Sequence, residues 1–179
     1  MSDPRDSTSG PYVTAQQGDA WAQDAARQGK RGTQRLLAVE TRAPSDEVRD
    51  ALELAAGETV VVRRRLILAD GQPVELADSY YPARVAEGTE LAEEKKIRGG
   101  AVRVLADAGL ALEDIAETIT ARLPDEGEQE ALAVSADQPL IVLTRVSRPA
   151  GGRPVEYAVN RMVADRTEPL HYRMRNSAQ

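Results

Sequence analysis

Residues 60–71 read VVVRRRLILADG and predict the first arm and the turn of a β-hairpin. Aliphatic residues that favour strands flank three arginines, and Asp70-Gly71 is a typical two-residue hairpin turn. The returning strand is predicted over residues 73–81. We take this hairpin as the centre of the fold.

The three arginines divide between the two faces of the first strand. Side chains alternate along a strand, so Arg63 and Arg65 share one face and Arg64 points to the other. A two-residue turn places Arg63 opposite Asp78 and Arg65 opposite Leu76. Opposite charges across such a ladder contribute about 0.2–1 kcal/mol.

Two interpretations of Arg63 and Arg65 stay open from the residues alone. In the structural interpretation, they form ion pairs with Asp78 and Glu117 and shield one face of the sheet. In the functional interpretation, one of them points into a concave site and binds a carboxylate or phosphate through two hydrogen bonds. A nucleic-acid patch is disfavoured, because the net charge is -6 and phenylalanine is absent.

The hairpin recurs 80 residues later, and each copy follows a strand and a helix. This offset aligns residues 60–62 with 140–142 and Arg65 with Arg145. After one extra residue in the second turn, it aligns residues 73–75 with 154–156. The repeat predicts an α+β fold with an antiparallel sheet of about six strands, flanking helices and an internal duplication. A cavity between two similar halves is a natural place for a ligand.

The remaining elements are predicted from periodicity and from helix-start signals. Residues 1–14 have the composition of a disordered tail or linker, and residues 15–179 form one domain with its core at 34–175. The predicted strands outside the hairpin are 34–42, 112–123, 139–148, 154–163 and 168–174. The predicted helices lie within 15–30 and at 45–54, 83–94 and 99–108, with a further helix from 124, and Ser45 is an N-cap.

Composition excludes several classes of protein and site. The chain has 179 residues, no cysteine and one histidine, so disulfides and His- or Cys-rich metal sites are excluded. Neither a signal peptide nor an apolar run of about 18 residues is found, which predicts a cytoplasmic protein without membrane contact. No catalytic triad, P-loop or dinucleotide motif is present, so we expect no cofactor, no metal and no enzyme.

Other candidate ligand-binding residues lie on the predicted strands and at one helix start. Gly99 and Gly100 stand where a helix begins, and two interpretations stay open: they present backbone N–H groups to an anion, or they form only a turn, which is the commoner role of a Gly-Gly pair. Glu117 is expected to be partly buried and therefore to need an arginine partner. Arg145 approaches from the second half, and Tyr80 is one of two adjacent tyrosines of which one packs inward.

Three stretches resemble the UTRA effector-binding domain, the ligand-sensing domain of the HutC subfamily of GntR-type bacterial transcription regulators. They are RRRLILADGQPVELADSYYP at 63–82, ETITARLPDEGEQEALAVSADQPLIVLTRV at 117–146 and GGRPVEYAVNRM at 151–162. The resemblance covers residues 34–175 and implies the antiparallel sheet and helices of chorismate lyase.

The resemblance implies a function and partners. A small, anionic or polar effector binds the domain and shifts the DNA affinity of a winged-helix domain that usually precedes it, and the domain forms a homodimer. Residues 10–14, GPYVT, resemble the end of the wing, so we expect no winged helix in this chain and DNA contact only through such a domain. The chain is then either a fragment or a stand-alone sensor.

The family's ligand residues carry over only in part. Arg65 matches the first arginine of an R-x-R motif, whereas Ile67 stands at the second. The glutamate of the last hairpin matches Glu156, and a tyrosine six residues later is replaced by Met162. The ligand-binding candidates are therefore Arg65 and Glu156, followed by Asp78, Tyr80, Arg145, Arg63, Glu117 and Gly100.

Two alternatives to an effector-binding domain stay open. One is an enzyme of the chorismate-lyase type, which rests on analogy of fold alone. The other is a stand-alone interaction module that dimerises with full-length regulators and binds no ligand.

Overall fold

The central hairpin forms as predicted. Strands β3 (Val60–Ala69) and β4 (Gln72–Pro82) pair antiparallel, and Ala69 faces Gln72 across the turn. Asp70 and Gly71 have φ angles of 50° and 82°. Two successive left-handed residues match the type I′ turn, whose twist suits the flanking strands.

The register of the hairpin differs from the prediction by one residue. A β-bulge shifts the pairing between Ile67 and Leu68, so that one residue of β4 is left over. The observed pairs are Arg63 with Ser79, Arg64 with Asp78 and Arg65 with Ala77. The predicted pairs of Arg63 with Asp78 and Arg65 with Leu76 are wrong, because counting from the turn cannot reveal an extra residue further along the strand.

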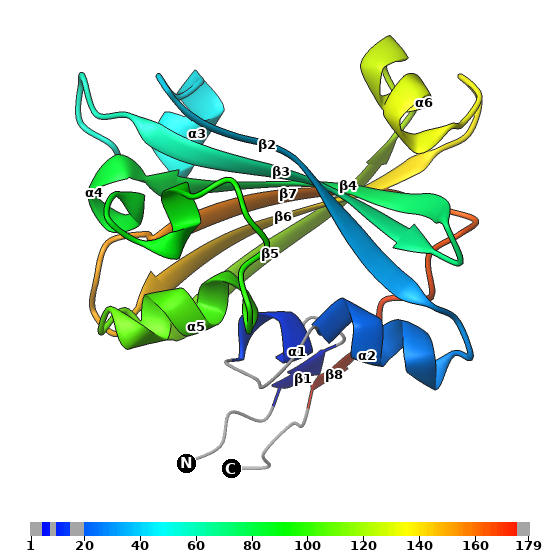
Figure 1. The fold of residues 1–179 in the computed structure, drawn as a ribbon, viewed down its shortest axis with the longest axis horizontal. Helices are drawn as coiled ribbons and strands as arrows, with labels where there is room; N and C mark the ends of the chain where they lie inside the picture. Colours follow the sequence, from blue (N-terminus) through cyan, green and yellow to red (C-terminus); the bar gives the residue numbers. More distant parts are fainter. Residues whose placement is uncertain (1–4, 8–9, 15–19, 175–179) are drawn as a thin grey trace.

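The computed structural model describes residues 5–7, 10–14 and 20–174. Six strands form one antiparallel sheet in the order β2-β3-β4-β7-β6-β5, with helices on both faces (Figure 1). The remaining strands of this sheet are β2 (Gly32–Arg42), β5 (Leu112–Arg122), β6 (Leu140–Pro149) and β7 (Glu156–Val163). The predicted α+β architecture is confirmed.

The sheet consists of two halves with the same internal geometry. The bounds of β5 and β6 are those of β2 and β3 displaced by 80 residues. The pair Val60–Pro82 of the first half has its counterpart in Leu140–Val163 of the second. Strands β4 and β7 therefore meet at a pseudo-two-fold axis in the middle of the sheet, which confirms the repeat as a structural one.

Two helices cover one face of the sheet, which we call the α3/α6 face (Figure 1). Helix α3 (Asp46–Ala51) is capped by Ser45, whose Oγ accepts from the backbone N–H of Val48 at 3.3 Å. Helix α6 (Glu126–Leu132) begins with a capping box between Asp125 and Glu128. Both helices pack aliphatic side chains against the sheet and fix this face as part of the core.

The opposite face, which we call the cavity face, lies toward helices α4 (Ala83–Ala86), α5 (Gly100–Asp107) and the 3-10 helix η1 (Glu90–Ala92). Tyr81 and Val61 of the sheet pack there against Leu91 and Leu105. The single helix predicted over 83–94 is wrong. It is divided near Gly88, whose φ of 75° is left-handed and ends the helical path.

The two ends of the chain meet below the cavity face (Figure 1). Strand β1 (Arg5–Ser7) pairs with β8 (Tyr172–Met174), and helices α1 (Gly10–Val13) and α2 (Ala20–Arg27) follow β1. Of the tail predicted over 1–14, the described residues form β1 and α1, and residues 1–4 and 8–9 lie outside the description. The last strand is shorter than predicted and joins β1 instead of the main sheet.

Among the described residues, no helix has the length and apolar character needed to cross a membrane.

Candidate functional site

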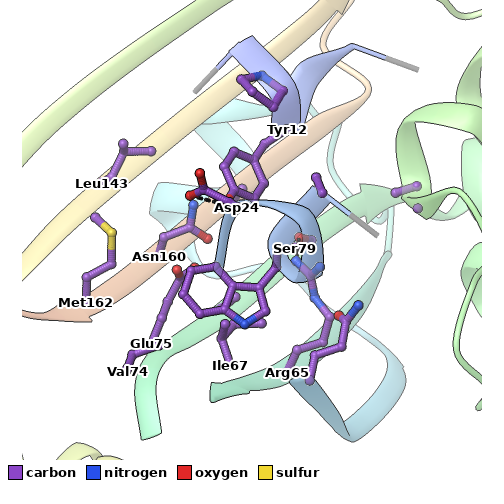
Figure 2. Close-up of a pocket in the computed structure, with 18 of the residues that line it drawn as sticks. Tyr12, Asp24, Arg65, Ile67, Val74, Glu75, Ser79, Leu143, Asn160 and Met162 are labelled. Atoms are coloured by element: carbon purple, nitrogen blue, oxygen red, sulfur yellow. Dashed lines mark hydrogen bonds between the residues drawn. The ribbon is translucent and has the colours of Figure 1, made fainter. Parts of the chain in front are cut away.

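A cavity of about 610 Å³ lies on the cavity face, where the two halves of the sheet meet. Side chains of β3, β4, β6 and β7 form its floor. Parts of α1 and α2, the start of α5 and residues 166–170 form its walls (Figure 2). The small side chains of Ala77 and Ala158 leave the middle of the floor open. The predicted cavity between the halves is thus present.

Arg65 reaches this cavity from β3. One terminal nitrogen donates to the Ser79 hydroxyl at 3.0 Å. Its Nε is buried and has no hydrogen-bond partner among the described residues. A buried cationic donor without an acceptor is costly, so this guanidinium is available for an acceptor that enters the cavity.

Glu156 also lines the cavity, but its carboxylate is already occupied. One oxygen accepts from the Tyr81 hydroxyl at 2.7 Å, and the other accepts from the Ser147 hydroxyl at 3.3 Å. Burial, followed by the charge of Glu156, raises the pKa of Tyr81 and keeps its phenol protonated as the donor. Glu156 therefore forms part of the cavity floor and is held in a fixed position.

Arg145, the counterpart of Arg65, lines the cavity and is likewise paired. Its Nε donates to Glu117 at 2.7 Å, and both side chains are largely buried. The structural interpretation, in which Glu117 and Asp78 neutralise Arg63 and Arg65, is therefore wrong in its partners. Glu117 lies on the outer strand β5 directly opposite Arg145, which explains the pairing.

Glu75 lines the cavity and is a residue that sequence reasoning missed. Its neighbours across the ladder are Ile67 and Met162, which offer no hydrogen bond. Within the described part of the chain, its carboxyl group makes neither a hydrogen bond nor an ion pair within 4 Å. Burial raises its pKa, and nearby arginines, Arg65 first among them, offset this only in part. The available signal was the repeat, which aligns Glu75 with Glu156.

An aromatic wall was also missed, because it comes from the predicted tail and from the segment that follows it. Trp21 lines the cavity and donates its indole N–H to the carbonyl of Leu68 at 2.9 Å. Tyr12 also lines the cavity, and its hydroxyl donates to Asp24 at 3.3 Å (Figure 2). These contacts place helices α1 and α2 against the open side of the cavity.

Gly100 lines the cavity at the first residue of α5. The preceding Gly99 has a φ of 76°, and a Cβ there would lie 3.0 Å from the Arg103 side chain. Glycine is therefore required at residue 99 to turn the chain into the helix.

Arg63 has a different position from the one expected of a ligand-binding residue. It is 5% exposed, and its guanidinium donates to the backbone carbonyls of Glu90, Leu91, Glu93 and Lys95 at 2.7–3.3 Å. Burial lowers its pKa. It lines only a smaller neighbouring cavity, so its donors anchor the connection between α4 and α5 to the sheet.

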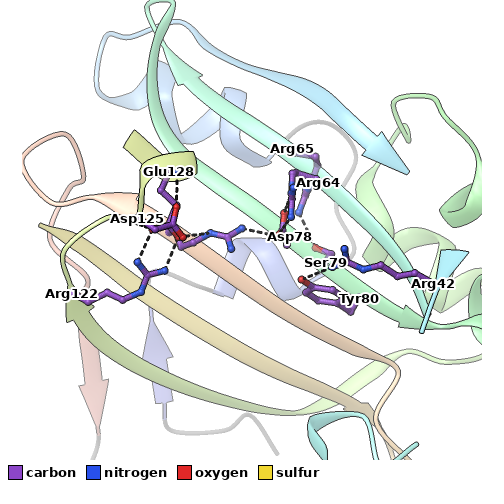
Figure 3. Close-up of polar contacts among 10 residues, drawn as sticks. Arg42, Arg64, Arg65, Asp78, Ser79, Tyr80, Arg122, Asp125 and Glu128 are labelled. Atoms are coloured by element: carbon purple, nitrogen blue, oxygen red, sulfur yellow. Dashed lines mark hydrogen bonds and ion pairs between the residues drawn. The ribbon is translucent and has the colours of Figure 1, made fainter. Parts of the chain in front are cut away.

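Asp78 and Tyr80 do not line the cavity, because both point to the α3/α6 face (Figure 3). Asp78 accepts two hydrogen bonds from Arg64, at 2.9 and 3.1 Å, and lies 2.7 Å from Arg161. Burial opposes its ionisation, but these two arginines hold its pKa below the ordinary value. The expectation that Asp78 shares a face with Arg63 and Arg65 and pairs with them is wrong, since the bulge moves Asp78 opposite Arg64.

Tyr80 stacks on Tyr157 with ring centroids 6.1 Å apart, and Arg42 lies over its ring. Its hydroxyl accepts from Arg42 at 3.4 Å. Tyr80 therefore belongs to the packing under α3.

Among the residues that the structure describes, no three acidic or histidine side chains are arranged to hold a metal ion.

Comparison with known proteins places this architecture in a family. The model of the UTRA domain matches residues 27–168. An HTH-type transcriptional regulator of Streptomyces coelicolor is 35% identical over 118 residues, which cover 64% of this chain and 44% of the regulator. The chain spans about half the length of such relatives.

Two solved structures have the same fold. The effector domain of PhnF from Mycobacterium smegmatis superimposes with a TM-score of 0.72 at 24% identity, over 84% of this chain and 91% of that one. The ligand-binding domain of a GntR-family regulator from Bordetella bronchiseptica gives 0.65 at 26% identity, over 83% and 91%. The chain therefore belongs to the UTRA family, the effector-binding domains of GntR-type transcription regulators.

Proposed function

We propose that this domain senses a small polar or anionic molecule in the cavity between its halves. The observation that carries the proposal is Arg65, which lines the cavity and whose buried Nε has no acceptor among the described residues. A cavity of about 610 Å³ is within the range that holds metabolites. Arg65 and the residues around the cavity floor are its ligand contacts, with Gly100 at the mouth.

The position of helices α1 and α2 supports a regulatory role. Residues of both helices line the cavity, and they follow the N-terminal strand β1. Residues 10–14 resemble the end of a winged-helix domain, so an occupant would touch the segment that leads toward DNA in a longer regulator. We propose that occupancy changes the DNA affinity of such a regulator in the bacterial cytoplasm, and that the effector is released chemically unchanged.

Binding can be tested with the single tryptophan of the chain, Trp21, because it lies in the cavity wall. A collection of sugars, sugar phosphates, amino acids and organic acids is screened by thermal shift and by tryptophan fluorescence. At ~100 times its dissociation constant, a ligand stabilises the fold by about 2.7 kcal/mol. Mass spectrometry of the recovered compound then tests whether it is unchanged.

Two substitutions show whether binding occurs in this cavity. Ala158→Phe fills the floor of the cavity and should abolish both signals. Val159→Phe, one residue along β7 and on the other face, is the matched control and should retain them. Ligands that bind the Ala158→Phe variant as tightly as the wild type would contradict the proposal.

We also propose that the domain forms a homodimer, as its family resemblance implies. Ile119 on the outer strand β5 and Leu123 just beyond it are 42% and 60% exposed, so this edge of the sheet presents two large aliphatic side chains that a second subunit would cover. Sedimentation analysis should show a dimer for the wild type and a monomer for Ile119→Asp. A monomeric wild-type protein at micromolar concentration would contradict this proposal.

A further inference from the structure

The two halves of the sheet place the same pair of charged residues around the cavity, but they satisfy them differently. Arg65 and Glu75 of the first half correspond to Arg145 and Glu156 of the second. All four side chains line the cavity. The second half thus shows which hydrogen-bond and ion-pair partners an arginine and a glutamate have when they are paired at these positions.

The arginines differ in the residue that faces them on the outer strand. Glu117 faces Arg145 and accepts its Nε hydrogen at 2.7 Å. Leu36 faces Arg65 and offers no acceptor. Unlike the Nε of Arg145, the Nε of Arg65 therefore remains without a partner among the described residues.

The carboxylates differ in both of their neighbours. Glu156 lies between Ser147 and Tyr81, and each of these donates a hydroxyl hydrogen to it. The counterparts beside Glu75 are Ile67 and Met162, which have no hydrogen to donate. Burial among such neighbours raises the pKa of Glu75, so a cation that enters the cavity would favour its ionised form.

Arg65 and Glu75 do not satisfy one another. They are diagonal neighbours across β3 and β4, which places their backbones roughly 7–8 Å apart. The Arg65 guanidinium leans toward Ser79, away from Glu75, and the gap between them lies over Ala77. A molecule in the cavity can therefore contact both groups at once.

We propose that the effector is amphoteric, with an anionic group that binds Arg65 and a positively charged amino group that binds Glu75. This proposal rests on the proposed function, since it names the chemical class of the molecule sensed in the same cavity. A purely anionic effector would leave the Glu75 carboxyl group without a cationic partner. A purely cationic effector would leave Arg65 without an anionic partner.

The test uses matched probes that differ only in their end groups. The first set is 5-aminopentanoate, glutarate and 1,5-diaminopentane, and the second is 4-(aminomethyl)benzoate, terephthalate and 1,4-bis(aminomethyl)benzene. Binding is measured through Trp21 fluorescence. In at least one set, the amphoteric member should bind about tenfold more tightly than both relatives, because a hydrogen bond to a charged group is worth that much.

Two Glu→Gln variants, one in the cavity and one on the surface, show whether the preference for the amphoteric probe depends on the charge of Glu75. Glu75→Gln should remove the preference for the amphoteric member over the dicarboxylate. Glu130→Gln makes the same change at an exposed position on α6 and should leave the preference intact. Equal or tighter binding of a dicarboxylate to the wild type, no binding of either amphoteric probe, or an unchanged preference in Glu75→Gln would overturn the amphoteric class.

The failure of this inference can be told apart from failure of the proposed function. If dicarboxylates or other anions bind the wild type and lose that binding in Ala158→Phe, the cavity is a sensor of another chemical class. If no compound in the wider collection changes the fluorescence of Trp21 or the melting temperature, the proposed function fails as well.

Discussion

Both faces of the sheet carry arginine and acidic side chains, which form ion pairs on one face, whereas Arg65 and Glu75 form none with each other on the other. On the α3/α6 face, Arg64 and Arg161 flank Asp78, and Arg122 pairs with Glu128 at 2.6 Å (Figure 3). On the cavity face, Arg65 and Glu75 lie close together without an ion pair between them. Charges that are paired within the protein hold the sheet and its helices together. Charges that are left open on the other face are available to a ligand.

The largest effect is expected from Asp78→Asn, which breaks the paired face. The substitution removes the carboxylate between Arg64 and Arg161 and leaves Arg161 with Glu128 alone, at 3.7 Å, and Asp78 is 1% exposed. Loss of one partner from a buried ion pair should lower the free energy of unfolding by about 3 kcal/mol. Urea denaturation at pH 7 measures this. A loss of less than about 1 kcal/mol would place the network among ordinary surface ion pairs.

The same variant should alter the pH dependence of stability. The pKa of Asp78 is lowered in the folded protein, so its stabilising contribution is present above its ordinary pKa of 3.8. That contribution is lost as the pH falls through the lowered pKa. The acid unfolding curve of Asp78→Asn should therefore be flatter than that of the wild type.

A smaller effect on stability is expected from Arg65→Ala on the open face. This change removes one hydrogen bond to Ser79 and should lower the free energy of unfolding by about 1 kcal/mol or less. The thermal shift produced by a ligand should be lost while the oligomeric state stays the same. If sedimentation shows that the assembly dissociates instead, Arg65 has a structural role.

The smallest effect on the free energy of unfolding is expected from Glu75→Gln, and this substitution should raise the free energy instead of lowering it. The pKa of Glu75 is raised in the folded protein, so ionisation costs stability as the pH rises above its ordinary value of 4.5. The wild type should therefore become less stable relative to Glu75→Gln as the pH increases toward 7. Denaturation at several pH values measures this difference.

Glu156→Gln is the matched comparison for Glu75→Gln. It weakens two charge-assisted hydrogen bonds, from Tyr81 and Ser147, and should lower the free energy of unfolding by about 1 kcal/mol at pH 7. Equal effects of the two substitutions would show that the two halves satisfy their carboxylates alike, contrary to the contacts described.

Much of the fold could be predicted from the sequence because its signals are local. Asp70-Gly71 predicted the turn, alternation divided Arg64 from its two neighbours, and Ser45 predicted a helix start. The 80-residue repeat predicted the six-stranded sheet. The division of residues 83–94 was missed, since nothing in the pattern there showed that Gly88 is left-handed.

The site could be predicted only in part. Arg65, Arg145, Glu156 and Gly100 line the cavity as expected of site residues, whereas Asp78 and Tyr80 lie on the other face. A single bulged residue in β4 accounts for the error at Asp78. Trp21 and Tyr12 were missed, because the packing of a terminal segment against a distant cavity leaves no local pattern.

The sequence by itself determined the hairpin, the repeat and the family, because turn chemistry, strand alternation and motif order act over short distances along the chain. Only the tertiary structure decided which charged groups are free. Arg65 and Arg145 occupy equivalent positions, and so do Glu75 and Glu156. Whether each group has a hydrogen-bond partner depends on its neighbours. Arg65 faces Leu36, whereas Arg145 faces Glu117. Glu75 lies beside Ile67 and Met162, whereas Glu156 lies beside Ser147 and Tyr81. These neighbours meet across strands, and their pairing depends on register, which short stretches of sequence do not specify.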